Sequence, residues 1–170
     1  MKAAVNHDVQ PPARHRPASR PRAPHKATGA SLVVVVCVVV CFVGIMLLHA
    51  VRSDVDPLRQ VMSNYANGSR GPVMSVVFYA FGVAALVLGL RLRTGVDRSG
   101  VTRPFPFLMI TAGVALIAAG VFEVDRPLAP QTVQEKIHSN SAVFAFVLLI
   151  VAMLLFSVCL LYTSPSPRDS

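Results

Sequence analysis

The stretch LVVVVCVVVCFVGIMLLHAV, residues 32–51, decides the fold because it is apolar throughout and carries no formal charge. As an α-helix, its 20 residues extend about 30 Å, which matches the hydrocarbon thickness of a bilayer. A short run so rich in valine would favour a buried strand, but lipid requires every backbone N–H and C=O to pair within the segment. The stretch is therefore predicted to be a membrane-spanning helix.

Three more stretches meet the same criterion of length and apolar character. They cover residues 73–90, 105–122 and 141–158, and shorter polar segments connect them. With 54% hydrophobic and 14% charged residues, the chain has too little polar material for a water-soluble domain of 170 residues. We predict an all-α fold, a polytopic transmembrane helical bundle with four spans in one domain, residues 31–158, and the lipid bilayer as its surroundings.

Residues 1–30 form a basic, proline-rich segment ahead of the first span. Six of the 16 Lys and Arg residues lie there, and Asp8 is the one acidic residue among them. Its apolar residues are mostly Ala and Val, so we predict a disordered cytoplasmic tail. Positive charge beside a span also explains the formal net charge of +8, so no nucleic-acid partner is expected. Adhesion of the tail to anionic lipid headgroups is a second interpretation.

The distribution of Lys and Arg predicts how the helices are oriented. The tail and the connection 91–104 carry ten of these residues, whereas the connections 52–72 and 123–140 carry five. We therefore expect a multi-pass protein of a prokaryotic cell membrane with its N-terminus in the cytoplasm. Five of the eight acidic residues lie on the opposite, outer side, and they are Asp54, Asp56, Glu123, Asp125 and Glu135.

Small residues recur on the predicted spans. Ser75, Gly82 and Gly89 repeat every seven residues on the second span. Such positions are typical of helices whose backbones approach closely in a membrane. Cys37 and Cys41, one turn apart on the first span, are interpreted as small apolar filler, although a thiol pair could bind a soft metal. The matching small residues of the third span are Ala112, Ala115 and Ala119.

The string CLLYTSPSPRDS, residues 159–170, resembles the translation of a sequencing-library adapter. This resemblance leads us to expect that the natural sequence is recorded only to about Val158 and that further helices follow in the complete protein. An ordinary tail rich in serine and proline is the alternative.

The two outer connections contain helix-capping patterns. Asp56 is expected to cap a short interfacial helix that Asn67 and Gly68 end, which would place Tyr65 among the lipid headgroups. In the later connection, Thr132 and Glu135 have the spacing of a capping box, which predicts that the fourth helix begins near residue 133. His138 would then lie on its second turn.

Two imidazoles and several carboxylates are thus expected at a similar depth on the outer side. Such groups could hold a catalytic zinc for lipid hydrolysis, with His49, Asp125 and His138 as metal-ligand candidates. They could instead relay protons or bind a substrate in a transporter or receptor, or simply be polar residues at headgroup level. The predicted spans contain no Asp, Glu, Lys, Arg or His at mid-depth, which argues against an ion pathway through these four helices alone. The catalytic candidates are Asp56, Ser63, Asp125 and His138.

Several of these residues belong to one larger pattern. It consists of Asp56, Pro57, Ser63, Tyr65, Gly68 and Gly71 before the second span, then Gly120, Phe122 and Asp125, then His138. This pattern, from the first span to residue 158, resembles the DUF998 family of bacterial and archaeal integral membrane proteins. The resemblance implies a helical membrane protein, usually with about six spans and no assigned activity. It also implies that the positions to test are Asp56, Ser63, Tyr65, Asp125 and His138.

Overall fold

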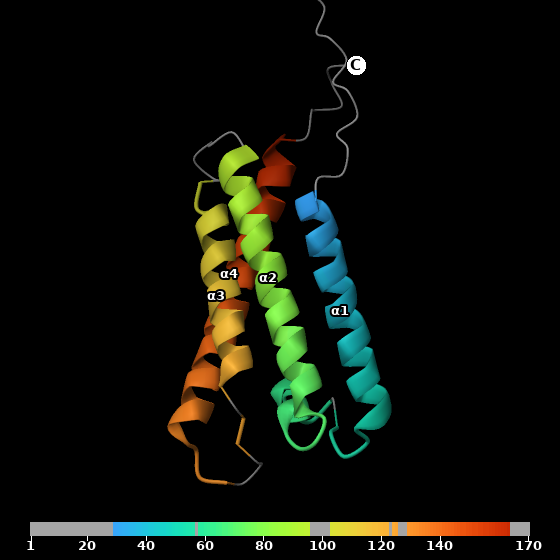
Figure 1. Ribbon diagram of the computed structural model, residues 1–170. Helices are drawn as coiled ribbons and strands as arrows, with labels where there is room; N and C mark the ends of the chain where they lie inside the picture. Colours follow the sequence, from blue (N-terminus) through green and yellow to red (C-terminus); the bar gives the residue numbers. More distant parts are fainter. Residues whose placement is uncertain (1–28, 57, 96–102, 123, 126–128, 164–170) are drawn as a thin grey trace, which may run out of the picture.

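The computed structural model describes residues 29–56, 58–95, 103–122, 124–125 and 129–163. Within these ranges the fold is all-α, as predicted, and four long helices run side by side (Figure 1). They are α1 (Gly29–Val51), α2 (Gly71–Gly95), α3 (Phe105–Val121) and α4 (Val133–Thr163), with a 3-10 helix, η1 (Met62–Ala66), between α1 and α2.

The helices confirm a membrane bundle. By length and apolar composition, α1, α2 and α4 can each cross a bilayer, and α3 is a shorter apolar helix of 17 residues. At about 1.5 Å per residue α3 extends about 25 Å, the lower end of the spanning range. The predicted tail lies outside the described residues except for its last two positions, which belong to α1. Of the adapter-like string, residues 159–163 continue α4 and the rest lie outside the described part.

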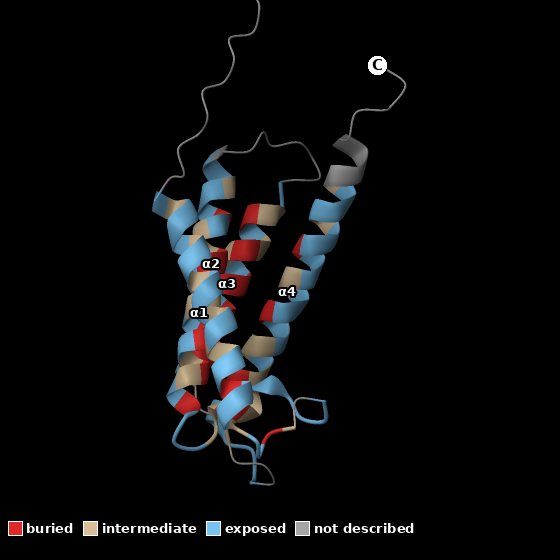
Figure 2. Cartoon of the chain, turned by 90° about the vertical axis from the view of Figure 1, so that its right-hand side faces the viewer, coloured by how far each residue is buried: buried red, intermediate tan, exposed pale blue. Residues whose placement is uncertain are grey.

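The helices pack in an open series rather than around a closed centre. Extensive contacts join α1 to α2, α2 to α3, and α3 to α4. Helix α4 has three buried residues among those described, His138, Ala145 and Ala152, which recur every seven residues along one stripe. Figure 2 shows α4 exposed over most of its remaining surface. The fully buried contacts of α4 therefore follow one narrow seam of two alanines and a histidine, beside which Leu149 and Phe156 also pack against the bundle.

Helices α2 and α3 touch backbone to backbone. A Cβ atom added at Gly82 would lie 2.8 Å from the Gly113 carbonyl oxygen, and one added at Gly113 would lie 2.7 Å from the Gly82 carbonyl oxygen. Further along, a Cβ at Gly89 would lie 2.9 Å from the carbonyl oxygen of Pro106. The predicted close packing of the glycines on α2 is confirmed, and it explains why these positions lack side chains.

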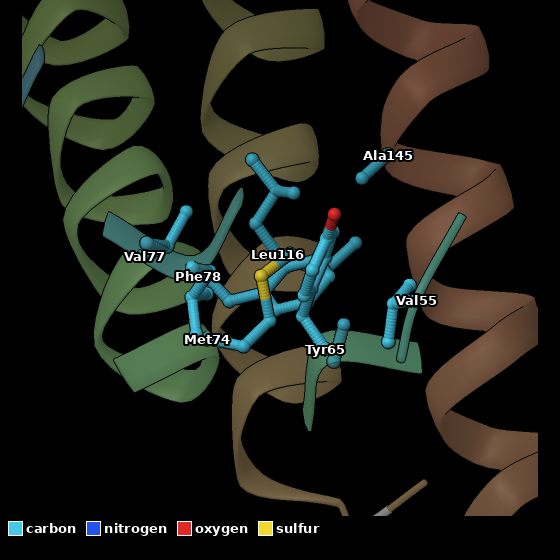
Figure 3. Packing of buried hydrophobic residues seen from close by; sticks show 10 residues of the cluster. Val55, Tyr65, Met74, Val77, Phe78, Leu116 and Ala145 are labelled. Atoms are coloured by element: carbon cyan, nitrogen blue, oxygen red, sulfur yellow. The ribbon is translucent and has the colours of Figure 1, made fainter. Parts of the chain in front are cut away.

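The main core lies toward the end where α1 and α3 finish and α2 and α4 begin, which we call the loop end. Figure 3 shows the Tyr65 side chain of η1 inserted among Met74, Phe78 and Leu116. Tyr65 is 1% exposed, so the expectation that it sits among headgroups was wrong. Instead, η1 folds back beneath the helices and buries the ring.

Candidate functional site

Arg52 holds the first connection in place. Its Nε and Nη2 atoms donate to the two carboxylate oxygens of Asp54, each at 2.8 Å. Its Nη1 donates to the carbonyl oxygen of Tyr65 at 3.2 Å and to that of Asn67. The hydrogen bonds from the Arg52 guanidinium lower the pKa of the Asp54 carboxyl below its ordinary value. Asp54 and Arg52 therefore organise this connection.

Asp56 and His49 make their contacts around the first connection, where the His49 ring lies 5.1 Å from the Tyr65 ring between centroids. Asp56 accepts a hydrogen bond from the Leu58 N–H at 2.9 Å, but the short helix expected to start there begins only at Met62. His49 is exposed, and its Nδ1 lies 3.0 Å from the carbonyl oxygen of Ile45 in its own helix. These contacts assign Asp56 to a turn and His49 to the end of α1.

Asp125 and Glu135 fasten the second connection to the start of α4. Asp125 accepts hydrogen bonds from the Thr132 N–H at 2.6 Å and the Thr132 hydroxyl at 3.1 Å. Glu135 accepts from the Asp125 N–H at 2.8 Å and from the Ser139 hydroxyl at 2.7 Å. The Glu135 N–H donates to Thr132 Oγ1 at 3.2 Å, which confirms one half of the predicted capping box. The Glu135 carboxylate reaches Asp125 instead of completing the other half.

His138 is 1% exposed, and its ring is held by the end of α3. Its Nδ1 lies 2.6 Å from the carbonyl oxygen of Ala119 and 3.2 Å from that of Phe122. Carbonyl oxygens can only accept, so Nδ1 carries a proton and donates to carbonyls that a helix terminus leaves without partners. The edge of the ring also meets Phe78, with the ring centroids 5.4 Å apart. His138 is thus a side-chain cap on α3.

The other ring nitrogen of His138, Nε2, is buried and makes no hydrogen bond. In the tautomer that carries its proton on Nδ1, Nε2 has a lone pair that can accept a hydrogen bond. The amide Nδ2 of Asn67 is the second buried side-chain nitrogen in the described part of the chain that lacks a partner. A buried polar atom without a partner costs about 1–3 kcal/mol, so the pair calls for an explanation.

Two adjoining cavities open at the loop end. The first, which we call the α2–α4 groove, has a volume of about 530 Å³ and is lined by Met74, Phe78 and Phe81 of α2 and by Ser139, Val143 and Phe146 of α4. The second, the His138 cavity, has a volume of about 750 Å³, and the residues lining it include Asn67, Ser75, Tyr79, Gly120, Asp125 and His138. Phe78 and Asp125 line both cavities.

The structure gathers part of the predicted site. Asp125 and His138 line one cavity, and Ser63 and Asp125 line the other. In the described ranges, no three His, Cys, Asp or Glu side chains come together as a group that could hold a metal ion. Sequence reasoning missed Asn67 as a site residue, because an Asn-Gly pair is read as a helix stop. It treated Glu135 only as a cap and did not single out Ser139.

Residues 35–167 match the model of a family described as protein of unknown function (DUF998). No curated protein and no solved structure matches the chain.

Proposed function

The chain belongs to the DUF998 family of proteins of unknown function, and we propose that this integral membrane protein binds an amphiphilic small molecule at its loop end. The apolar part of the ligand lies in the α2–α4 groove, and its polar part lies at the end of the bundle. The observation that carries this proposal is the change in chemistry along the groove.

The groove is apolar in its deeper part and polar toward the loop end. Along the helices its walls are Val77 and Phe81 of α2 and Phe146 of α4, whereas Asn64 and Glu135 line it near the connections. Ligand sites are typically apolar clefts with a few polar groups that orient the ligand. A molecule with one apolar and one polar end matches this gradient.

The hydrogen bonds of the two acidic residues favour binding over metal-dependent hydrolysis. Each carboxylate oxygen of Asp125 and Glu135 accepts a hydrogen bond from the chain itself, at 2.6 to 3.1 Å. These bonds shape the wall of the groove. A catalytic zinc would need the same oxygens, together with further ligands close by.

A groove ligand can be detected with a single tryptophan, because the 170 residues of this sequence include none. Val143 lines the groove, whereas Val147, one turn further along α4, is similarly exposed and does not line it. In phosphatidylcholine vesicles doped with a diacylglycerol that carries brominated acyl chains, V143W fluorescence is expected to be quenched at low mole fraction and to saturate. V147W is expected to be quenched in proportion to the bulk concentration of the brominated lipid.

The matched pair separates a bound ligand from ordinary contact with lipid. Both residues are valines on the same helix, and both indoles would meet acyl chains. Saturable quenching of V143W alone supports a site in the groove. Identical, non-saturating curves for the two variants would remove the proposal.

The orientation of the bundle forms part of the proposal: the loop end faces outward, and the N-terminus lies in the cytoplasm. The support is the excess of basic residues at the other end and in the tail. With the native cysteines replaced by alanine, Ser69→Cys is expected to react with an impermeant maleimide added to intact cells, and Thr94→Cys only after lysis. Both positions are exposed, at opposite ends of the bundle. The reverse pattern would contradict this orientation.

A further inference from the structure

We propose that the His138 cavity receives an uncharged hydroxyl group of the ligand, so that the bound amphiphile is a neutral lipid with a free hydroxyl, such as a diacylglycerol. This inference rests on the proposed function, since the groove is taken to hold the acyl chains. The evidence for it is a pair of buried polar atoms without partners, Nε2 of His138 and Nδ2 of Asn67, in two residues that line this cavity.

His138 supplies an acceptor to this cavity. Its Nδ1 proton is committed to the carbonyl oxygens of Ala119 and Phe122, which leaves Nε2 buried and without a donor. The cap on α3 requires only Nδ1, so the fold does not use Nε2. A ligand O–H directed at Nε2 would satisfy it.

Asn67 supplies a donor to the same cavity. Its amide Nδ2 is buried without a partner, while its backbone carbonyl oxygen accepts from Arg52. The residue therefore stays in place through its backbone and leaves the side-chain amide free. A hydroxyl group both donates and accepts, so its chemistry matches that of both unpartnered atoms.

The charges around the cavity favour an uncharged group. Asp125 lines the cavity, and among the described residues no Lys or Arg does so. The nearby Arg52 guanidinium is occupied by both carboxylate oxygens of Asp54. An anionic headgroup would thus meet a carboxylate without a compensating cation.

The two cavities meet at shared walls. Phe78 and Asp125 line both, so the cavities adjoin, and the proposal places the chains in the α2–α4 groove and the head in the His138 cavity. A free polyol has the same hydroxyl chemistry without the chains. The groove favours the lipid as the source, and the experiment below separates the two.

The test compares the brominated diacylglycerol with its methyl ether, in which the hydroxyl proton is replaced, using the V143W reporter in phosphatidylcholine vesicles. Loss of the O–H removes the donor to Nε2, so the ether is expected to need about a tenfold higher mole fraction for half-maximal quenching. In His138→Asn, the amide N–H can still donate to Ala119, while Oδ1 takes the place of the ring carbon Cδ2 and the shorter side chain puts no acceptor at the position of Nε2. This variant is expected to bind both lipids about equally.

Asn67→Leu in the V143W background gives an independent second test. Nδ2 makes no hydrogen bond, so its removal costs none and the fold is retained. Both lipids keep the oxygen that accepts from Nδ2. Loss of Nδ2 is therefore expected to raise the mole fraction for half-maximal quenching about tenfold for the alcohol and the ether alike. Asn140→Leu is the control, since Asn140 is exposed and lines neither cavity; it leaves both curves unchanged.

The results distinguish failure of the hydroxyl inference from failure of the proposed groove site. If V143W is quenched saturably and equally by the alcohol and the ether, the hydroxyl inference is wrong and the proposed groove site stands. If neither lipid gives saturable quenching, both fail. If excess glycerol displaces the lipid from V143W but not from V143W with His138→Asn, the hydroxyl site is supported and a soluble polyol is identified as a source.

Discussion

Gly113→Leu is expected to separate α2 from α3 and to lower the free energy of unfolding by about 3 kcal/mol. A Cβ at this position would lie 2.7 Å from the Gly82 carbonyl oxygen and 3.0 Å from the Leu86 nitrogen. Both atoms belong to the backbone of α2, which cannot move aside without breaking the contact between the helices. Thermal unfolding in detergent micelles measures the loss.

Gly29→Leu is the matched control, because a Cβ at Gly29 would meet no atom within 4 Å. It is expected to change the stability by less than about 0.5 kcal/mol. Equal losses for the two variants would mean that the close contact between α2 and α3 does not determine the stability of the bundle.

His138→Ala is expected to cost about 3 kcal/mol, through the cavity it leaves and the carbonyl oxygens of Ala119 and Phe122 that lose their donor. The change acts at the seam that attaches α4 to α3. His138→Asn is expected to recover part of the loss, since its amide N–H replaces Nδ1. Unfolding of the variants in the same detergent gives the comparison.

The control for this prediction is the second histidine of the loop end. His49 is exposed, its Nδ1 pairs with its own helix and its ring packs on that of Tyr65, so His49→Ala is expected to cost about 1 kcal/mol or less. A loss at His138 no larger than that at His49 would show that the cap on α3 contributes little.

Features of the fold that depend on local chemistry could be predicted from the sequence. The Thr132 and Glu135 spacing predicted a helix start near residue 133, and α4 begins at Val133. The glycines at 82 and 89 predicted close packing, because in lipid only small side chains allow backbones to touch. In both cases a short-range rule determines the outcome.

The candidate site depends on contacts between distant residues, which leave no periodic mark in a sequence. The carbonyl oxygens that hold His138 belong to residues 16 and 19 positions earlier. Tyr65 is buried because η1 folds back and Arg52, 13 positions earlier, bonds its carbonyl oxygen. The side-chain amide of Asn67 lacks a partner because Arg52 fixes the backbone of the connection between α1 and α2 in a position where no other described residue reaches Nδ2. None of these contacts could be inferred from spacing.

The most direct test of the central claim, a lipid bound in the α2–α4 groove, is a map of cross-links from a diacylglycerol with a photoreactive diazirine in its acyl chain. After irradiation in vesicles and digestion, mass spectrometry identifies the modified residues. If the lipid binds in the groove, adducts concentrate on residues 74–81 of α2 and 139–146 of α4. Adducts spread evenly over the exposed face of α1, with no excess in the groove, would contradict it.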